Sequence, residues 1–177
     1  MDFPTTYLES AKFEFHRYKR YGDKTFEQLS EEELFWSASE NDNSIAVIVN
    51  HLAGNMLSRW TNFLTEDGEK VWRDRDSEFE HPPQTKIELL DLWEKGWQCL
   101  FNALNSITPE NFDTAIQIRN EKHSIPQAIN RQLAHYASHV GQLLFIGKMI
   151  KKDDWVSLSI PKGQSKIFNK KMFGENS

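Results

Sequence analysis

Two histidines spaced four residues apart, His135 and His139, are the residues of this sequence whose types and spacing are best suited to chemistry. On an α-helix, side chains at positions i and i+4 lie one above the other on the same face. Two imidazoles in this arrangement can reach one divalent cation. Simple surface pairs have the same spacing, so the pair favours a metal site only if another element supplies a third ligand.

The most suitable third ligand is His51. It lies in a segment that starts at Asn43 or Ser44, and an apolar stripe of helical period places His51 and Asn55 beside the core-facing surface. Three neutral imidazoles leave one coordination position open, which is typical of catalytic zinc sites. Nickel, iron, cobalt or manganese accept similar ligands. A hydrogen-bonded core histidine is the alternative interpretation, and the residues alone leave both open.

Three nearby residues are candidates for supporting the ligands or contacting a substrate: Asn55, Arg131 and Tyr136. Arg131 comes four residues before His135, so it is predicted at the rim of the same helix face. There it can hold an anionic group of a substrate, or simply be a solvated charge. The single cysteine, Cys99, lies in an apolar helical segment and is interpreted as a buried structural thiol.

The composition excludes several classes of protein. The net charge of −5 argues against a general nucleic-acid binder, because phosphates require a basic face. One cysteine rules out an internal disulfide and fits a reducing compartment. The first residues do not resemble a signal peptide, and no apolar stretch reaches the roughly 18 residues of a membrane span. We therefore expect a cytoplasmic protein with a single domain over residues 1–177 and no membrane role.

Four helices are predicted to position these side chains. Apolar residues recur with helical period over residues 5–21, 45–63, 85–104 and 123–150. Gly22 is a predicted stop for the first helix. Ser124 and Gln127 have the spacing of a capping box at the start of the helix that carries the histidine pair.

The segments between and after these helices are less regular. The connection 65–84 is long and charged, and such loops often cover a site. Residues 112–122 alternate weakly and could be extended, without an obvious partner strand. The tail, 153–177, has no helical period but is too apolar for a free tail. The predicted fold is all-α: a four-helix bundle with a crossover connection over residues 1–152, and a non-helical C-terminal tail whose first half at least packs on it.

Three segments of the sequence resemble a known superfamily. The segments 43–45, 50–52 and 135–142, which contain the three histidines, resemble the DinB-like superfamily of four-helix metalloproteins. The segment 158–165 resembles its branch known as DUF1572, a family of uncharacterised bacterial proteins. The resemblance implies a crossover bundle, commonly a homodimer, with a nickel or zinc site whose ligands fall on His51, His135 and His139.

The resemblance leaves the function open, because fold is a weak guide to chemistry. Some members of the superfamily are metal-dependent thiol transferases that use bacillithiol, mycothiol or glutathione, and others are hydrolases or isomerases. Our first hypothesis is a metal-dependent thiol S-transferase or hydrolase acting on a small molecule. The alternative is a non-catalytic dimeric bundle protein in which the metal is structural or adventitious.

Overall fold

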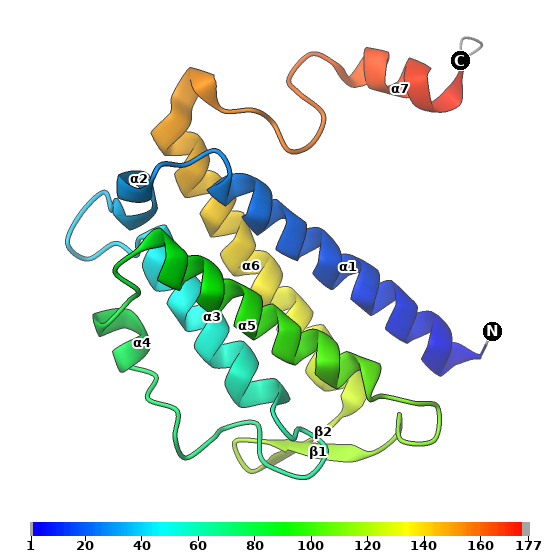
Figure 1. Cartoon of the computed structure of the whole chain (residues 1–177). Helices are drawn as coiled ribbons and strands as arrows, with labels where there is room; N and C mark the ends of the chain where they lie inside the picture. Colours follow the sequence, from blue (N-terminus) through cyan, green and yellow to red (C-terminus); the bar gives the residue numbers. More distant parts are fainter. Residues whose placement is uncertain (1, 175–177) are drawn as a thin grey trace.

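A computed structural model describes residues 2–174 of the chain and is mostly helical (Figure 1). This agrees with the predicted all-α class. Within the described residues, no helix is both long enough and apolar enough to cross a bilayer. The elements in chain order are α1 (Phe3–Phe26), α2 (Glu31–Phe35), α3 (Ile45–Trp60), α4 (Ser77–Glu80), α5 (Lys86–Asn105), β1 (Ala115–Ile118), β2 (Glu121–Ser124), α6 (Ile125–Lys151), the 3₁₀ turn η1 (Lys152–Asp154) and α7 (Ser165–Phe173).

Four long helices, α1, α3, α5 and α6, lie alongside one another (Figure 1). The pairs that pack most extensively are α3 with α5 and α1 with α6. Helices α3 and α5 run in the same direction, so the connection 61–85 must carry the chain back along their length (Figure 1). Large aromatic side chains fill the space between the helices, and Trp93, Trp97 and Tyr136 are almost completely buried.

Local capping explains where the site-bearing helices begin. Ser44 accepts a hydrogen bond from the backbone N–H of Val47 at 3.3 Å and starts α3. Ser124 and Gln127 form the predicted capping box at the start of α6. Thr85 and Glu88 do the same for α5.

Helix α1 does not stop at Gly22 as predicted, but continues to Phe26. Gly22 is buried, and a Cβ atom at this position would overlap the ring of Trp93. The Trp93 indole donates to the Asp23 carboxylate at 2.7 Å, which fixes the ring against the helix. Glycine is therefore present for close packing between α1 and α5, and this contact outweighs its low helix propensity of about 1 kcal/mol.

The weakly alternating segment is part of a hairpin whose second strand leads directly into α6. Strands β1 and β2 pair antiparallel, with Ile118 opposite Glu121. The two turn residues, Arg119 and Asn120, have φ values of 55° and 62°. Two left-handed residues are the signature of a type I′ turn, but glycine occupies neither position, so the sequence contains little sign of it. The Asp67 carboxylate accepts both turn N–H groups, at 2.8 and 2.7 Å.

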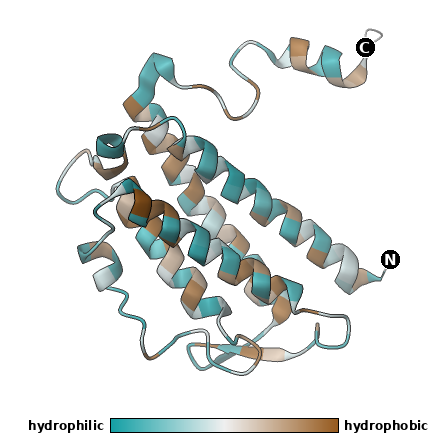
Figure 2. Cartoon of the chain, in the orientation of Figure 1, coloured by the Kyte–Doolittle hydropathy of each residue, from teal (hydrophilic) through white to brown (hydrophobic). Residues whose placement is uncertain are grey.

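The prediction of a non-helical tail is wrong for its second half. The first half does lie against the rest of the chain: Val156 N–H donates at 2.8 Å to the Gln28 side chain, just beyond the end of α1, and Trp155 packs over Gly147 of α6. Residues 165–173 form α7, whose residues are all exposed and which lies away from the long helices (Figure 1). Figure 2 shows that α7 nevertheless carries hydrophobic residues. A single short amphipathic helix has too few turns to produce a clear period in sequence.

The packing at Gly22 can be tested against a matched helical glycine. Gly22→Ala should lower the free energy of unfolding by about 1–3 kcal/mol, because its methyl group overlaps Trp93. Gly141, in α6, faces open space, and a Cβ atom added there would meet no atom within 4 Å. Gly141→Ala should therefore raise the free energy of unfolding by up to about 1 kcal/mol. Urea unfolding of both variants provides the comparison, and equal stabilities would contradict the packing argument.

Candidate metal centre

The structure brings the three predicted ligands together. His135 Nε2 lies 3.4 Å from His51 Nε2 and 3.0 Å from His139 Nε2. One ligand atom from each ring lies within 4.8 Å of the other two. Nitrogens bound about 2.05 Å from a tetrahedral metal are about 3.3 Å apart, close to these separations. The group of His51, His135 and His139 could therefore hold a metal ion.

Two helices supply the ligands. His135 and His139 lie one turn apart on α6, and His51 comes from α3, which packs against α6. His51 is buried, with 5% of its surface exposed, whereas the other two are half-buried. The site therefore lies at the edge of the core, where one side remains open to a ligand.

Two of the rings are held neutral by their surroundings. Burial, together with the nearby His139 and His51, lowers the pKa of His135 to about 4. Burial also lowers the pKa of His139. At neutral pH both imidazoles keep the nitrogen lone pair that a metal requires.

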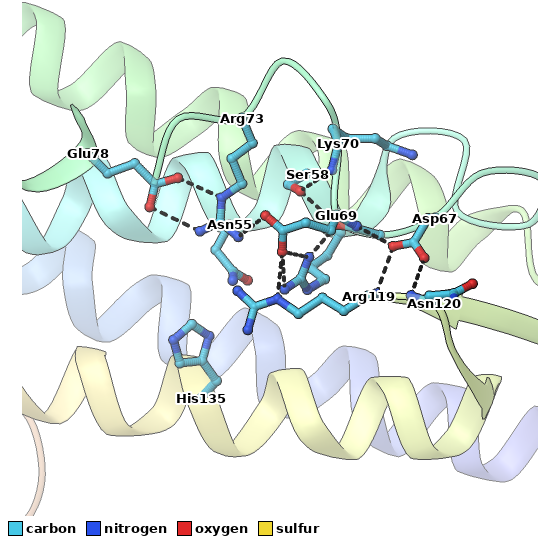
Figure 3. A network of polar contacts seen from close by, with 12 residues as sticks. Asn55, Ser58, Asp67, Glu69, Lys70, Arg73, Glu78, Arg119, Asn120 and His135 are labelled. Carbon is cyan, nitrogen blue, oxygen red and sulfur yellow. Dashed lines mark hydrogen bonds and ion pairs between the residues drawn. The ribbon is translucent and has the colours of Figure 1, made fainter. Parts of the chain in front are cut away.

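The other nitrogen of His51 is held by a carboxylate. Glu78 Oε2 lies 2.8 Å from His51 Nδ1. Arg73 binds the same carboxylate with two contacts, Nε to Oε1 at 2.7 Å and Nη2 to Oε2 at 3.0 Å (Figure 3). Burial acts to raise the pKa of Glu78, but the hydrogen bonds from His51 and Arg73 outweigh it and hold that pKa below its usual value. A charged Glu78 favours the proton on Nδ1 and leaves Nε2 free.

Glu78 reaches His51 because residue 54 has no side chain. A Cβ atom at Gly54 would overlap the Glu78 carboxylate. Gly54 lies on α3 about one turn after His51, and Glu78 comes from α4 in the long connection. Neither Gly54 nor Glu78 stands out from any pattern in the sequence. The charged character of residues 65–84 was the only signal, and it did not single out one carboxylate.

The third imidazole has a partner on its own helix. His139 Nδ1 lies 2.7 Å from Gln142 Oε1, so Nδ1–H donates a hydrogen bond to the amide oxygen when Nε2 is free. Gln142 is exposed, in contrast to the enclosed Glu78. The partner of His51 is therefore charged and enclosed, whereas the partner of His139 is neutral and open to solvent.

The predicted supporting residues have different positions. Asn55 and Arg131 line one cavity together with His51 and His135. Tyr136 is fully buried, and its hydroxyl donates to Asn55 Oδ1 at 3.1 Å while accepting from Trp60 Nε1 at 3.1 Å. Tyr136 therefore orients Asn55 from within the core. Burial raises the pKa of Tyr136, so its hydroxyl keeps its proton.

The predicted structural cysteine lies outside this group. Cys99 is half-buried on α5, with Sγ 3.5 Å from Thr61 Oγ1. It lines a different cavity, together with Trp60 and Thr61. Cys99 is therefore less enclosed than the predicted buried thiol, because one side of it faces this cavity.

A mostly helical chain with three converging imidazoles defines a candidate metal-binding helical protein. The chain belongs to the DUF1572 family, described as "Protein of unknown function (DUF1572)", whose model matches residues 2–164. Neither the curated proteins nor the solved structures contain a match to this chain. The family match covers all three histidines and nearly all of the segment 158–165.

Removing the charge that holds His51 should weaken metal binding. Glu78→Gln keeps an acceptor near Nδ1 but loses the negative charge, and partners of this kind are worth about 10- to 100-fold in metal affinity. Competition of zinc or nickel against a chromogenic chelator measures the change. Glu80→Gln, at an exposed position two residues away, is the matched control and should bind as wild type. Equal affinities in all three proteins would show that Glu78 has no part in the site.

A side chain at position 54 should also weaken metal binding, because it would displace the Glu78 carboxylate. Gly54→Ala should displace Glu78 and lower metal affinity by a similar factor. In the Glu78→Gln background the added methyl group should cost much less, because the charged contact is already lost. The same chelator competition over this double-mutant cycle tests the coupling. Additive losses would mean that Gly54 acts independently of Glu78.

Proposed function

We propose that this protein is a divalent-metal-dependent enzyme with His51, His135 and His139 as the ligands. The observation that carries the proposal is the convergence of three Nε2 atoms from α3 and α6. Nickel or zinc suits three imidazoles best, and iron, cobalt or manganese would accept them. When bound, such an ion supplies a Lewis acid that lowers the pKa of a bound water or thiol.

The finer architecture that we propose is a DinB-like four-helix bundle with a crossover connection. Support comes from the four long helices and from the parallel course of α3 and α5, joined by residues 61–85 (Figure 1). In this arrangement, α3 and α6 present ligands from facing surfaces, as metal sites in helix bundles do. We further propose that the protein forms a homodimer.

For the reaction we propose thiol S-transfer or hydrolysis of a small molecule. Both reactions need a nucleophile that is ionised at neutral pH. The contributions of this chain are neutral imidazoles at His135 and His139, a fixed ring at His51, and a polar cavity next to His51 and His135. Asn55, whose Oδ1 accepts from the Tyr136 hydroxyl, also lines that cavity.

A non-catalytic role is the second candidate. It is favoured by a groove of about 620 Å³ between residues 36–43 and α6, which is lined by the exposed side chains of Trp36, Phe145 and Met149. Exposed aromatic and methionine side chains are enriched at protein interfaces. In this alternative, a dimer surface is the functional part and the metal only stabilises the fold.

The test compares metal content and activity in the same preparations. Wild type should retain about one equivalent of zinc or nickel after purification without a tag, and His51→Ala and His139→Ala should lose it. His81→Ala, at an exposed position in the connection, is the control and should behave as wild type. Retained stoichiometric metal in either ligand variant would overturn the assignment.

Activity separates the two candidates. With bacillithiol, mycothiol or glutathione and monochlorobimane as electrophile, the enzyme hypothesis expects conjugation that chelation and both ligand variants abolish. A panel of ester and amide substrates tests hydrolysis in the same way. If metal removal lowers only the thermal midpoint, and no substrate is turned over, the non-catalytic alternative stands.

A further inference from the structure

A cavity of about 240 Å³ lies directly beside two of the three imidazoles, His51 and His135. Five arginines line it: Arg59, Arg73, Arg75, Arg119 and Arg131. They come from α3, the long connection, the hairpin turn and α6, so only the folded chain brings them together. No aspartate or glutamate is among the described residues that line this cavity.

The nearby carboxylates neutralise only part of this charge. Glu69 is shared by three of the arginines: its Oε2 lies 3.1 Å from Arg59 and 2.9 Å from Arg119, and its Oε1 lies 3.8 Å from Arg73 (Figure 3). Glu78 pairs with Arg73 as described above. Glu69 and Glu78 pair with three of the five guanidinium groups, and the Asp67 carboxylate lies near Arg59, so the positive charge around the cavity is only partly neutralised.

Two of the arginines are available to a ligand. Between residues 2 and 174, neither Arg75 nor Arg131 has a carboxylate within salt-bridge distance. The Arg75 guanidinium lies over the Phe79 ring, 5.2 Å from its centroid, which positions it without neutralising it. Arg131 is exposed at the cavity rim.

Two enclosed polar atoms at the cavity also lack partners. Arg59 Nε and Gln132 Oε1 form no hydrogen bond within the described part of the chain. Their residues are 6% and 2% exposed, and both line the cavity. A buried donor or acceptor without a partner is unfavourable, so such atoms mark a place where a ligand or water completes the bonding. Arg59 Nε can donate to an anion, whereas Gln132 Oε1 needs a donor such as water.

We propose that this arginine-lined cavity binds the oxyanion group of a small metabolite, a carboxylate or a phosphate, next to His51 and His135. The guanidinium groups offer paired N–H donors, which match the oxygens of either group. The proposal deepens the function proposed above, since its catalytic meaning rests on a metal at the three histidines. Anion binding itself rests only on the arginines.

The size of the cavity limits the ligand. Pockets for drug-sized molecules measure about 300–1,000 Å³, and this one is smaller. A polymer would need an extended basic surface, whereas here the charge is confined to one cavity in a protein with a net charge of −5. The substrate class is thus a small acid or phosphorylated metabolite.

The experiment measures anion binding to the full chain by isothermal titration calorimetry at constant ionic strength. Inorganic phosphate and succinate are the two probes, and each is titrated into metal-free and zinc-loaded protein. Arg131→Gln and Arg75→Gln remove the unpaired charges at exposed positions, so both variants should fold. Arg20→Gln, an exposed arginine on α1, is the matched control.

We expect metal-free wild type to bind at least one probe, and the better probe identifies the phosphate or the carboxylate as the preferred group. Arg131→Gln and Arg75→Gln should each weaken that binding about tenfold or more, and Arg20→Gln should not change it. Three results would overturn the proposal: no binding of either anion, equal weakening by Arg20→Gln, or binding only in the zinc-loaded protein. The two proposals can fail separately. Histidine variants that lose the metal but still bind the anion would show that anion binding does not depend on the metal site. Arginine variants that keep the metal but lose the anion would show that the metal site does not depend on anion binding.

Discussion

The buried chain of contacts from His51 to Glu78 to Arg73 is the constraint on which the rest of the site depends. The Glu78 and Arg73 side chains are only 8% and 2% exposed. A buried charge that loses its partner costs about 3–5 kcal/mol, so neither group can be enclosed without the other. Their pairing therefore fixes α4 and the preceding loop over α3. Gly54 provides the space in which the carboxylate meets the histidine.

The same connection is tied to the opposite side of the site by a second set of charges. Glu69 binds Arg59 from α3 and Arg119 from the hairpin, and Asp67 accepts the N–H groups of the hairpin turn. Arg59 also donates to the Gly68 carbonyl. Because strand β2 leads directly into α6, these contacts link α3, the long connection and the start of the helix that carries His135 and His139.

This organisation creates a fixed and asymmetric electrostatic field at the site. On one side of His51 lies a charged carboxylate, and on the other lies a cavity with an excess of arginines. Fixed charges at the margin of a core act more strongly than charges in water and need little reorganisation when a ligand binds. This field matches the cation that we propose at the histidines and the anion that we propose among the arginines.

Interactions between residues close in sequence could be predicted from the sequence. The capping box at Ser124 depends on residues three apart, and the relation of His135 to His139 on residues four apart. Both follow from helix geometry alone. Two features of the sequence indicate His51 as the third ligand: its place beside an apolar stripe and the resemblance to a family. The match over residues 2–164 confirmed the family at the level of DUF1572.

Tertiary structure decided the features that depend on distant contacts. Gly22 is a packing residue because Trp93, 71 positions later, lies against it, and Glu78 is a partner of His51 because the connection folds back over 27 residues. The arginine cavity combines four segments that no local pattern relates. Helix caps and periods are set by bonds within a few residues, whereas close approach and charge pairing are set by which surfaces meet after folding. The sequence by itself therefore determined the four long helices and the pair of histidines on α6, and only the tertiary structure decided what surrounds them.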